Sequence, residues 1–256
     1  MTKEQSNGLK VLCALMVFFC HVNPYVNMWG FIPVGCFFFI AGYGCMLSRK
    51  NPLYRCVRLG LIYLFVCGIY SLVSGEVNFQ LPFGWYFLVY GLQMFFIWVS
   101  PEWKIVLVLD FILSVMMWKL DFTYPWYTSM VMFPLGMRVA ASGFFDGRLL
   151  AGSLALGSLV FLYSYGFPVL LWMLSVPLTF ALIHFRNAYV KLDKLSFLTM
   201  PFFVIHCLFL DMLGVRKDMG FPLFADSMTL SIILAFFGSA AGAYLLHKFF
   251  NVAFNK

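Results

Sequence analysis

The chain has 256 residues, of which 63% are hydrophobic and only 11% are charged, and 32 of them are phenylalanine. Its mean hydropathy of +0.91 comes from apolar stretches along the whole length, which excludes a water-soluble globular protein and indicates an integral membrane protein. The formal net charge of +7 matches the excess of lysine and arginine in the cytoplasmic loops of membrane proteins, so no nucleic-acid partner is expected.

Ten apolar segments follow one another along the chain, and each is predicted to cross the membrane as an α-helix. They are centred near residues 15, 39, 65, 92, 112, 134, 156, 175, 205 and 239. Most are about 17 to 24 residues long, which suits a hydrocarbon core of about 30 Å. Short breaks such as "SRKNPLYR" and "HFRNAYVKLDK" separate them, although the break "SYGFP" also allows one bent helix in place of the seventh and eighth. The sequence therefore predicts an all-α integral membrane protein, with residues 1–256 forming one domain, a bundle of about ten transmembrane helices.

The basic residues predict the orientation of this bundle. With ten spans, the two termini and every second loop lie on one side, and this side holds 14 of the 17 lysines and arginines. Because short cytoplasmic loops are rich in lysine and arginine, both termini are predicted to be cytoplasmic. The 14 residues are Lys3, Lys10, Arg49, Lys50, Arg55, Arg58, Lys104, Arg138, Arg148, Arg186, Lys191, Lys194, Lys248 and Lys256, against Lys119, Arg216 and Lys217 on the other side.

The first apolar segment, "LKVLCALMVFFCHVNP", contains two ionisable side chains, Lys10 and His21. Eleven residues make about three helical turns, so the two side chains share one helix face about 16 Å apart. Lys10 lies at the cytoplasmic end, where a lysine can also simply anchor the helix. His21 lies in the outer half. Since imidazole exchanges a proton near neutral pH, we favour a catalytic histidine over an interfacial one.

No sequence motif points to a metal or a tightly bound cofactor. The seven cysteines lie in apolar segments, and no CxxC pair occurs among them. The sequence also has no HExxH, GxSxG, P-loop or dinucleotide-binding motif. We therefore expect no metal site and no permanently bound cofactor.

The two ends of the first helix resemble the acyltransferase 3 family of membrane proteins, whose first helix has an arginine, ten further residues and a histidine. Here Lys10 takes the place of the arginine, and His21 that of the histidine. The segment "CFFFIAGYGC" is similar to the family's second helix, with Phe38, Gly42 and Tyr43 matching and alanine in place of a serine.

Three further stretches carry the resemblance through the chain. "RKNPLYRCVR" supplies the arginine pair Arg55 and Arg58 after the second helix, "GWYFLVYGL" supplies Trp85 at the start of the fourth, and "LSFLTMPFFVIHCLFL" supplies His206 in the ninth. Aromatic residues such as Trp85 are also common as packing or interfacial residues in membrane helices. The ten spans with both termini inside are likewise similar to the family.

The resemblance implies an O-acyltransferase in the cytoplasmic (inner) membrane of a bacterium. It implies transfer of an acyl group, with acetyl the leading choice, from cytoplasmic acyl-CoA (acetyl-CoA) as co-substrate to a hydroxyl of a surface polysaccharide or lipid-linked sugar. His21 would act as general base or carry the acyl group, and both roles stay open. Lys10, Arg55 and Arg58 would bind the phosphates of acyl-CoA, although the two arginines also fit plain cytoplasmic loop residues. The bilayer and the sugar acceptor are the expected partners, and a homodimer is allowed.

Two polar residues of the ninth segment complete the predicted site. His206 lies near the middle of the span and is expected to face the bundle interior, either in a structural hydrogen bond or as a support for the site. Asp211 could orient His21 if the first and ninth helices meet. The residues predicted to line or support the site are thus Phe38, Gly42, Tyr43, Trp85, His206 and Asp211.

Two other functions stay open at this stage. A transporter or flippase could use the same buried cations to move an anionic or glycan substrate, although no repeated pair of Gly/Pro-broken spans supports it. A catalytically inactive family member could serve as an assembly subunit. The acyltransferase interpretation requires a cavity from Lys10 to His21.

Overall fold

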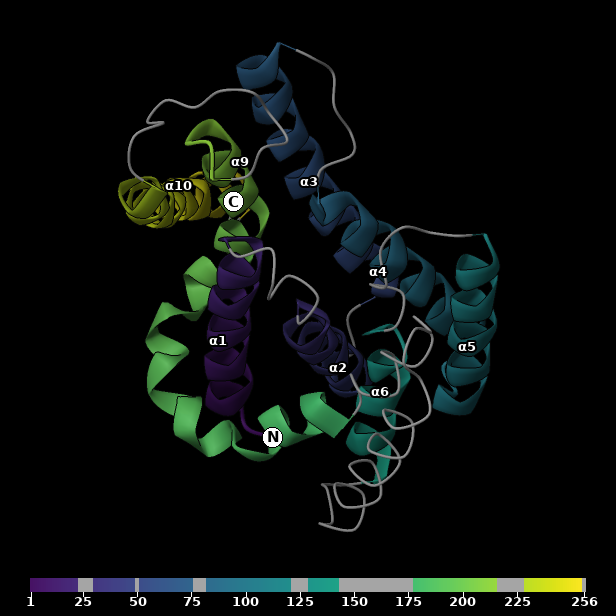
Figure 1. The fold of residues 1–256 in the computed structure, drawn as a ribbon. Coiled ribbons are helices and arrows are strands. Elements are labelled where there is room, and N and C mark those ends of the chain that lie inside the picture. The colour runs from purple at the N-terminus through teal and green to yellow at the C-terminus, as the bar shows by residue number, and fades with distance from the viewer. Residues whose placement is uncertain are drawn as a thin grey trace.

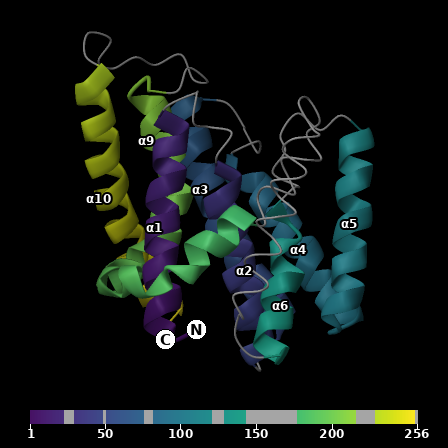
Figure 2. The ribbon, with the colours of Figure 1, turned by 60° about the horizontal axis from the view of Figure 1, so that its bottom comes forward.

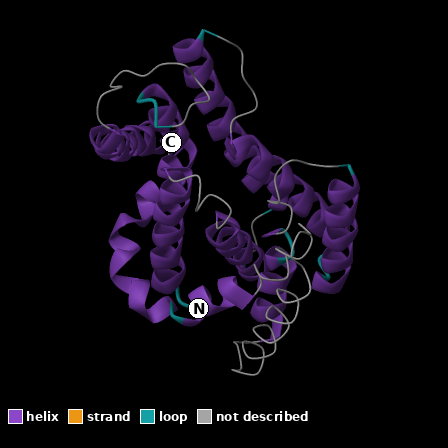
Figure 3. Cartoon of the chain, in the orientation of Figure 1, coloured by secondary structure: helices purple, strands orange, loops and turns teal. Residues whose placement is uncertain are grey.

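The computed structural model of the chain describes residues 1–22, 30–48, 51–75, 82–120, 129–142, 177–215 and 228–254. Within these residues all secondary structure is helical and no strand is present (Figures 1 and 3). The helices are α1 (Lys3–Val22), α2 (Phe31–Leu47), α3 (Pro52–Ser74), α4 (Pro82–Val99), α5 (Trp103–Lys119), α6 (Met132–Ser142), the 3₁₀-helix η3 (Arg186–Leu198), α9 (Thr199–Met212) and α10 (Met228–Phe254). Residues 177–184 are also helical.

The all-helical prediction is confirmed for the described residues, and four helices are long and apolar enough to cross a membrane. These four span Lys3–Val22, Leu53–Val73, Arg186–Met212 and Met228–Asn251. The segments centred near residues 39, 92, 112 and 134 correspond to the shorter helices α2, α4, α5 and α6. The seventh segment and most of the eighth lie outside the described residues, so the count of ten spans and the side of the termini stay predictions.

Large apolar side chains remain exposed on several helices, as a lipid-facing surface requires. Leu72 on α3, Phe111 on α5 and Leu245 on α10 are among them. In water such exposure would be unfavourable, because burying a side chain of this size is worth about 1.5–3 kcal/mol. In a bilayer these side chains meet acyl chains of the same polarity, so the exposed apolar surface supports a membrane location.

Local sequence signals set the ends of α3. Asn51 precedes the helix, and its side-chain oxygen accepts a hydrogen bond from the backbone nitrogen of Leu53 at 2.9 Å. Pro52 follows in the first turn, where a missing N–H costs nothing. Gly75 ends the helix with a φ of 73°, a left-handed conformation that glycine adopts without strain. The charged break that the sequence predicts before this span is therefore also its N-terminal cap.

Helices α2 and α6 approach each other closely through two glycines, and they make the most extensive helix pair in the described structure. A Cβ atom at Gly42 would overlap the carbonyl group of Phe133, and one at Gly136 would overlap that of Phe39. Small residues that let two backbones approach are typical of helix contacts in membranes. Gly42, predicted as a site residue, therefore has a packing role in the structure.

Replacing Gly136 by alanine is expected to lower the free energy of unfolding by about 1–3 kcal/mol, since the new methyl group must push α2 and α6 apart. The matched control is Gly44→Ala on α2, where an added Cβ meets no atom within 4 Å. Thermal unfolding in detergent measures both variants. Equal unfolding temperatures for Gly136→Ala and Gly44→Ala would contradict the close contact.

The polar stretch that the sequence predicts as a break before the ninth segment is helical. It forms η3, which runs across α1 before the chain turns into α9 (Figures 1 and 2). Two hydrogen bonds join it to α1: Asn7 of α1 donates to the Asp193 carboxylate at 2.7 Å, and Gln5 donates to Asn187 at 2.6 Å. Tyr189 and Leu198 of η3 also pack against the hydrophobic core, so polar and apolar contacts together hold this segment.

Candidate functional site

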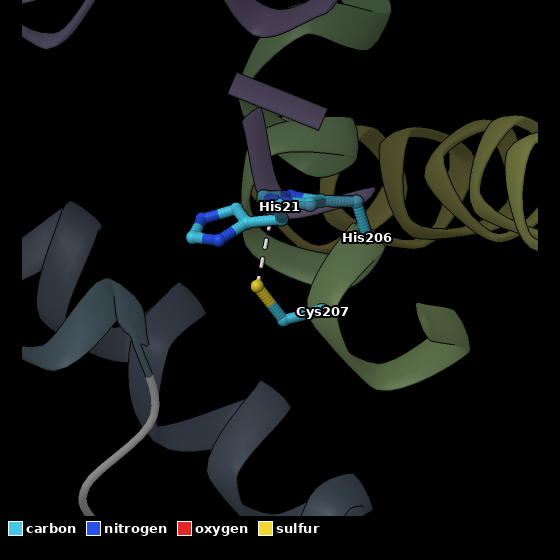
Figure 4. A group of neighbouring side chains, drawn as sticks. All are labelled: His21, His206 and Cys207. Atoms are coloured by element: carbon cyan, nitrogen blue, oxygen red, sulfur yellow. Dashed lines mark hydrogen bonds between the residues drawn. The ribbon is translucent and has the colours of Figure 1, made fainter. Parts of the chain in front are cut away.

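Helix α9 packs against α1 and brings His206 beside His21. The centroids of the two imidazole rings lie 5.3 Å apart, with 31° between the ring planes (Figure 4). His206 is 2% exposed, which confirms that it faces the bundle interior. The rings of Phe18 and Phe202 lie 6.2 and 6.1 Å from the His206 ring. Two histidines separated by most of the chain thus lie side by side, His206 buried and His21 partly buried.

Backbone carbonyls of α9 determine the tautomer of His206. Its Nδ1 lies 2.8 Å from the carbonyl oxygen of Phe203 and 3.2 Å from that of Phe202. A carbonyl oxygen only accepts hydrogen bonds, so Nδ1 carries the proton. In the neutral ring, Nε2 therefore presents its lone pair, and the sulfur of Cys207 lies 3.3 Å from this nitrogen.

His21, His206 and Cys207 together form a compact group of donor atoms. Their ring nitrogens and the sulfur lie within 4.8 Å of one another, and both α9 residues are buried. Figure 4 shows the two rings and the thiol turned toward the same space between α1 and α9. Cys207 does not belong to the predicted site. Its position directly after His206, in a helix with few polar residues, is the sequence feature that could have indicated it.

Asp211 links α9 to a third helix. Its carboxylate is fully buried and accepts a hydrogen bond from the hydroxyl of Tyr70 on α3 at 3.0 Å. The condition set for its predicted role is met, since α1 and α9 are in contact. The hydrogen bond from Tyr70 connects α9 to α3. The orienting role of Asp211 toward His21 stays a prediction.

Near the other end of α1, Lys10 lies close enough to Arg55 for the two charges to repel. The Arg55 guanidinium donates to the Gly44 carbonyl at 3.3 Å and to the Cys45 sulfur at 3.1 Å. These partners lie in the last turn of α2, where the helix dipole favours a cation. Three helices thus meet at a pair of cations that no carboxylate bridges within the described residues. The side chain of Arg58 lies outside what the structure describes.

For the remaining predicted residues that it describes, the structure shows packing contacts, and their part in a site stays a prediction. Phe38 is fully buried and stacks on Tyr86, with ring centroids 4.9 Å apart. Tyr43 stacks on Phe39 at 6.5 Å, and its hydroxyl accepts a hydrogen bond from the Met1 nitrogen at 3.0 Å. The side chain of Trp85 lies outside the described residues.

A second buried carboxylate lies on α5. Asp110 is fully buried and accepts a hydrogen bond from Gln93 of α4 at 3.3 Å, and Gln93 also donates to the Met130 carbonyl at 3.0 Å. This network joins α4, α5 and the segment before α6. It involves none of the predicted site residues.

An open pocket of about 540 Å³ lies at the junction of η3 and α10. Its lining residues are Phe197, Tyr244, His247, Lys248 and Asn251. Neither Lys10 nor His21 belongs to it, so this pocket is not the cavity that the acyltransferase interpretation requires.

In comparisons with known proteins, no family model matches the chain, and no curated protein or solved structure matches it either. Fold and site alone therefore define its class. The described residues form an all-helical protein with helices able to span a membrane, in which the partly buried His21 and the buried His206 and Cys207 form a group between α1 and α9.

Proposed function

We propose that this protein is a membrane O-acyltransferase that moves an acyl group, acetyl in the leading case, from cytoplasmic acyl-CoA to a hydroxyl of a surface polysaccharide or lipid-linked sugar. One observation carries the proposal. Lys10 and His21 lie on the unbroken helix α1, Lys10 toward its start beside Arg55 of α3, and His21 toward its end beside His206 of α9. An acyl-CoA donor requires cations near the cytoplasmic side of the membrane to bind its phosphates. A hydroxyl acceptor requires a base deeper in the membrane to take up its proton.

The chemistry follows from the two pairs. Lys10 of α1 and the two arginines of α3, Arg55 and Arg58, bind the phosphates of acyl-CoA through charge-assisted hydrogen bonds. His21 accepts the proton of the acceptor hydroxyl while the hydroxyl oxygen attacks the thioester carbonyl. The carbon–sulfur bond breaks, and the CoA thiolate leaves and takes up a proton. His206, held by two carbonyls, positions the His21 ring.

The proposal includes a ten-span bundle with both termini in the cytoplasm of a bacterium. Support comes from the charge asymmetry of the loops and from the helices already described at eight of the ten segments. In this orientation Lys10 faces the cytoplasm, where acyl-CoA is made, and His21 lies toward the outer leaflet.

The test is an assay of the purified full-length protein with labelled acetyl-CoA and two acceptors, a short oligosaccharide and a polyprenyl-linked sugar. Release of CoA together with label on the acceptor is the expected result. The rival function is tested with the same preparation in liposomes: movement of labelled glycan across the bilayer without use of acetyl-CoA would replace the proposal by a transporter. If neither donor use nor transport occurs, the chain is an inactive member that serves assembly.

A further inference from the structure

We propose that His21, His206 and Cys207 form a binding site for a transition-metal ion of the Zn²⁺ class. The sequence predicts no metal site, since His21 and the His206–Cys207 pair are far apart along the chain and no CxxC motif is present. The packing of α9 on α1 removes this separation. It places two imidazoles and one thiol, the ligand types that zinc prefers, around one point.

The distance between the Cys207 sulfur and His206 Nε2 fits a tetrahedral ion. With zinc–nitrogen bonds of about 2.0–2.1 Å and a zinc–sulfur bond of about 2.3 Å, neighbouring ligand atoms lie about 3.3–3.6 Å apart. The Cys207 sulfur and His206 Nε2 are 3.3 Å apart, and all three donor atoms lie within 4.8 Å of one another. The site requires the His21 nitrogen to move from within 4.8 Å of the other donor atoms to about 3.3–3.6 Å, and the side chain that must turn is partly exposed.

The surroundings of His206 match those of a metal ligand. A ligating histidine almost always donates its second ring N–H to a carbonyl, carboxylate or water, which fixes the tautomer and the ring orientation. The Nδ1 of His206 does this toward Phe202 and Phe203, so in the neutral ring the lone pair of Nε2 lies on the side of Cys207. The ring is therefore held in the ligating orientation by the protein alone.

The donor set also indicates the kind of ion. Ca²⁺ and Mg²⁺ require oxygen ligands, whereas nitrogen and sulfur ligands select zinc and the other late transition metals. Binding releases the Cys207 thiol proton to solvent, since the thiolate is the ligand. Three protein ligands leave one tetrahedral position for water. Binding at His21 also occupies the lone pair that a general base needs, so metal binding and the proposed proton transfer exclude each other.

The experiment uses the full-length protein, purified in detergent with a tag that contains no histidine and treated with a chelator. Titration with Co²⁺ is expected to give a thiolate-to-cobalt charge-transfer band that saturates at one equivalent. Zn²⁺ affinity is measured by competition with a chromogenic chelator. Loss of a second-shell partner costs about 10–100-fold in affinity, so loss of a ligand in Cys207→Ser or His206→Gln should cost about 100-fold or more.

Two controls match these variants. Cys20→Ser removes a buried thiol from α1, and His184→Ala removes an exposed imidazole outside the group. Both should keep the charge-transfer band and the parent affinity. Added Zn²⁺ should raise the unfolding temperature of the parent and of both controls, but not of Cys207→Ser. A band that survives in Cys207→Ser, or no band in the parent, would overturn the site. Since no acyl donor is present, this outcome is independent of the proposed acyl transfer.

Discussion

Replacing His21 by alanine is expected to lower kcat of acyl transfer by about 10²–10⁴-fold, because the acceptor hydroxyl then loses its general base. The KM for acyl-CoA should change little, since Lys10 and Arg55, the cations proposed to bind the donor, lie toward the start of α1. The measurement is a steady-state rate with labelled acetyl-CoA in the presence of a chelator, which keeps metal ions from His21.

The control for this variant is His184→Ala, which removes an exposed histidine from another part of the chain. Thermal unfolding of both variants in detergent separates a catalytic loss from a folding defect. A His21→Ala variant that unfolds like the parent and transfers acyl groups at the parent's rate would remove His21 from the mechanism.

Replacing Lys10 by methionine is expected to raise the KM for acyl-CoA about 10- to 100-fold with kcat nearly unchanged. A hydrogen bond between charged groups contributes about 1.5–3 kcal/mol, and its loss weakens donor binding by that amount. Lys10→Arg should keep or lower the KM, because a guanidinium holds a phosphate through two parallel hydrogen bonds. Initial rates over a range of acetyl-CoA concentrations measure these effects.

Two controls make the Lys10 prediction specific. Lys3→Met removes an exposed lysine from the same helix and should leave the KM unchanged. Acetyl-pantetheine, a donor without phosphate, should give equal KM values for the parent and for Lys10→Met. If Lys10→Met raises the KM for both donors alike, Lys10 does not bind phosphate, and its role is to anchor α1 in the headgroup region.

Buried polar groups in the described bundle differ in what they do for the protein. Asp110 and Asp211 each accept a hydrogen bond from a neighbouring helix, and both connections hold helices together. His206 contacts backbone carbonyls of its own helix, so its Nε2 side remains directed toward Cys207. Ionisable groups within a membrane are costly and commonly functional. Of the three, His206 has the geometry of a ligand or a positioning residue.

The sequence determined the helical class and the membrane character, because apolar runs of this length satisfy their backbone hydrogen bonds in a bilayer only as helices. It also determined that Lys10 and His21 share one helix, since α1 is continuous from Lys3 to Val22. The sequence also determined the ends of α3, because the caps at Asn51 and Gly75 depend only on residues next to them in the chain.

Only the tertiary structure decided which helices meet. The contact of His21 with His206, the Tyr70–Asp211 hydrogen bond and the close approach of Gly42 to the Phe133 backbone all join residues far apart in the chain. Helix periodicity predicts which side chains share a face. Because lipid and the protein interior are equally apolar, hydropathy does not predict which face contacts another helix. Side-chain packing makes that choice, and it is what adds Cys207 to the site and assigns Gly42 to the contact between α2 and α6.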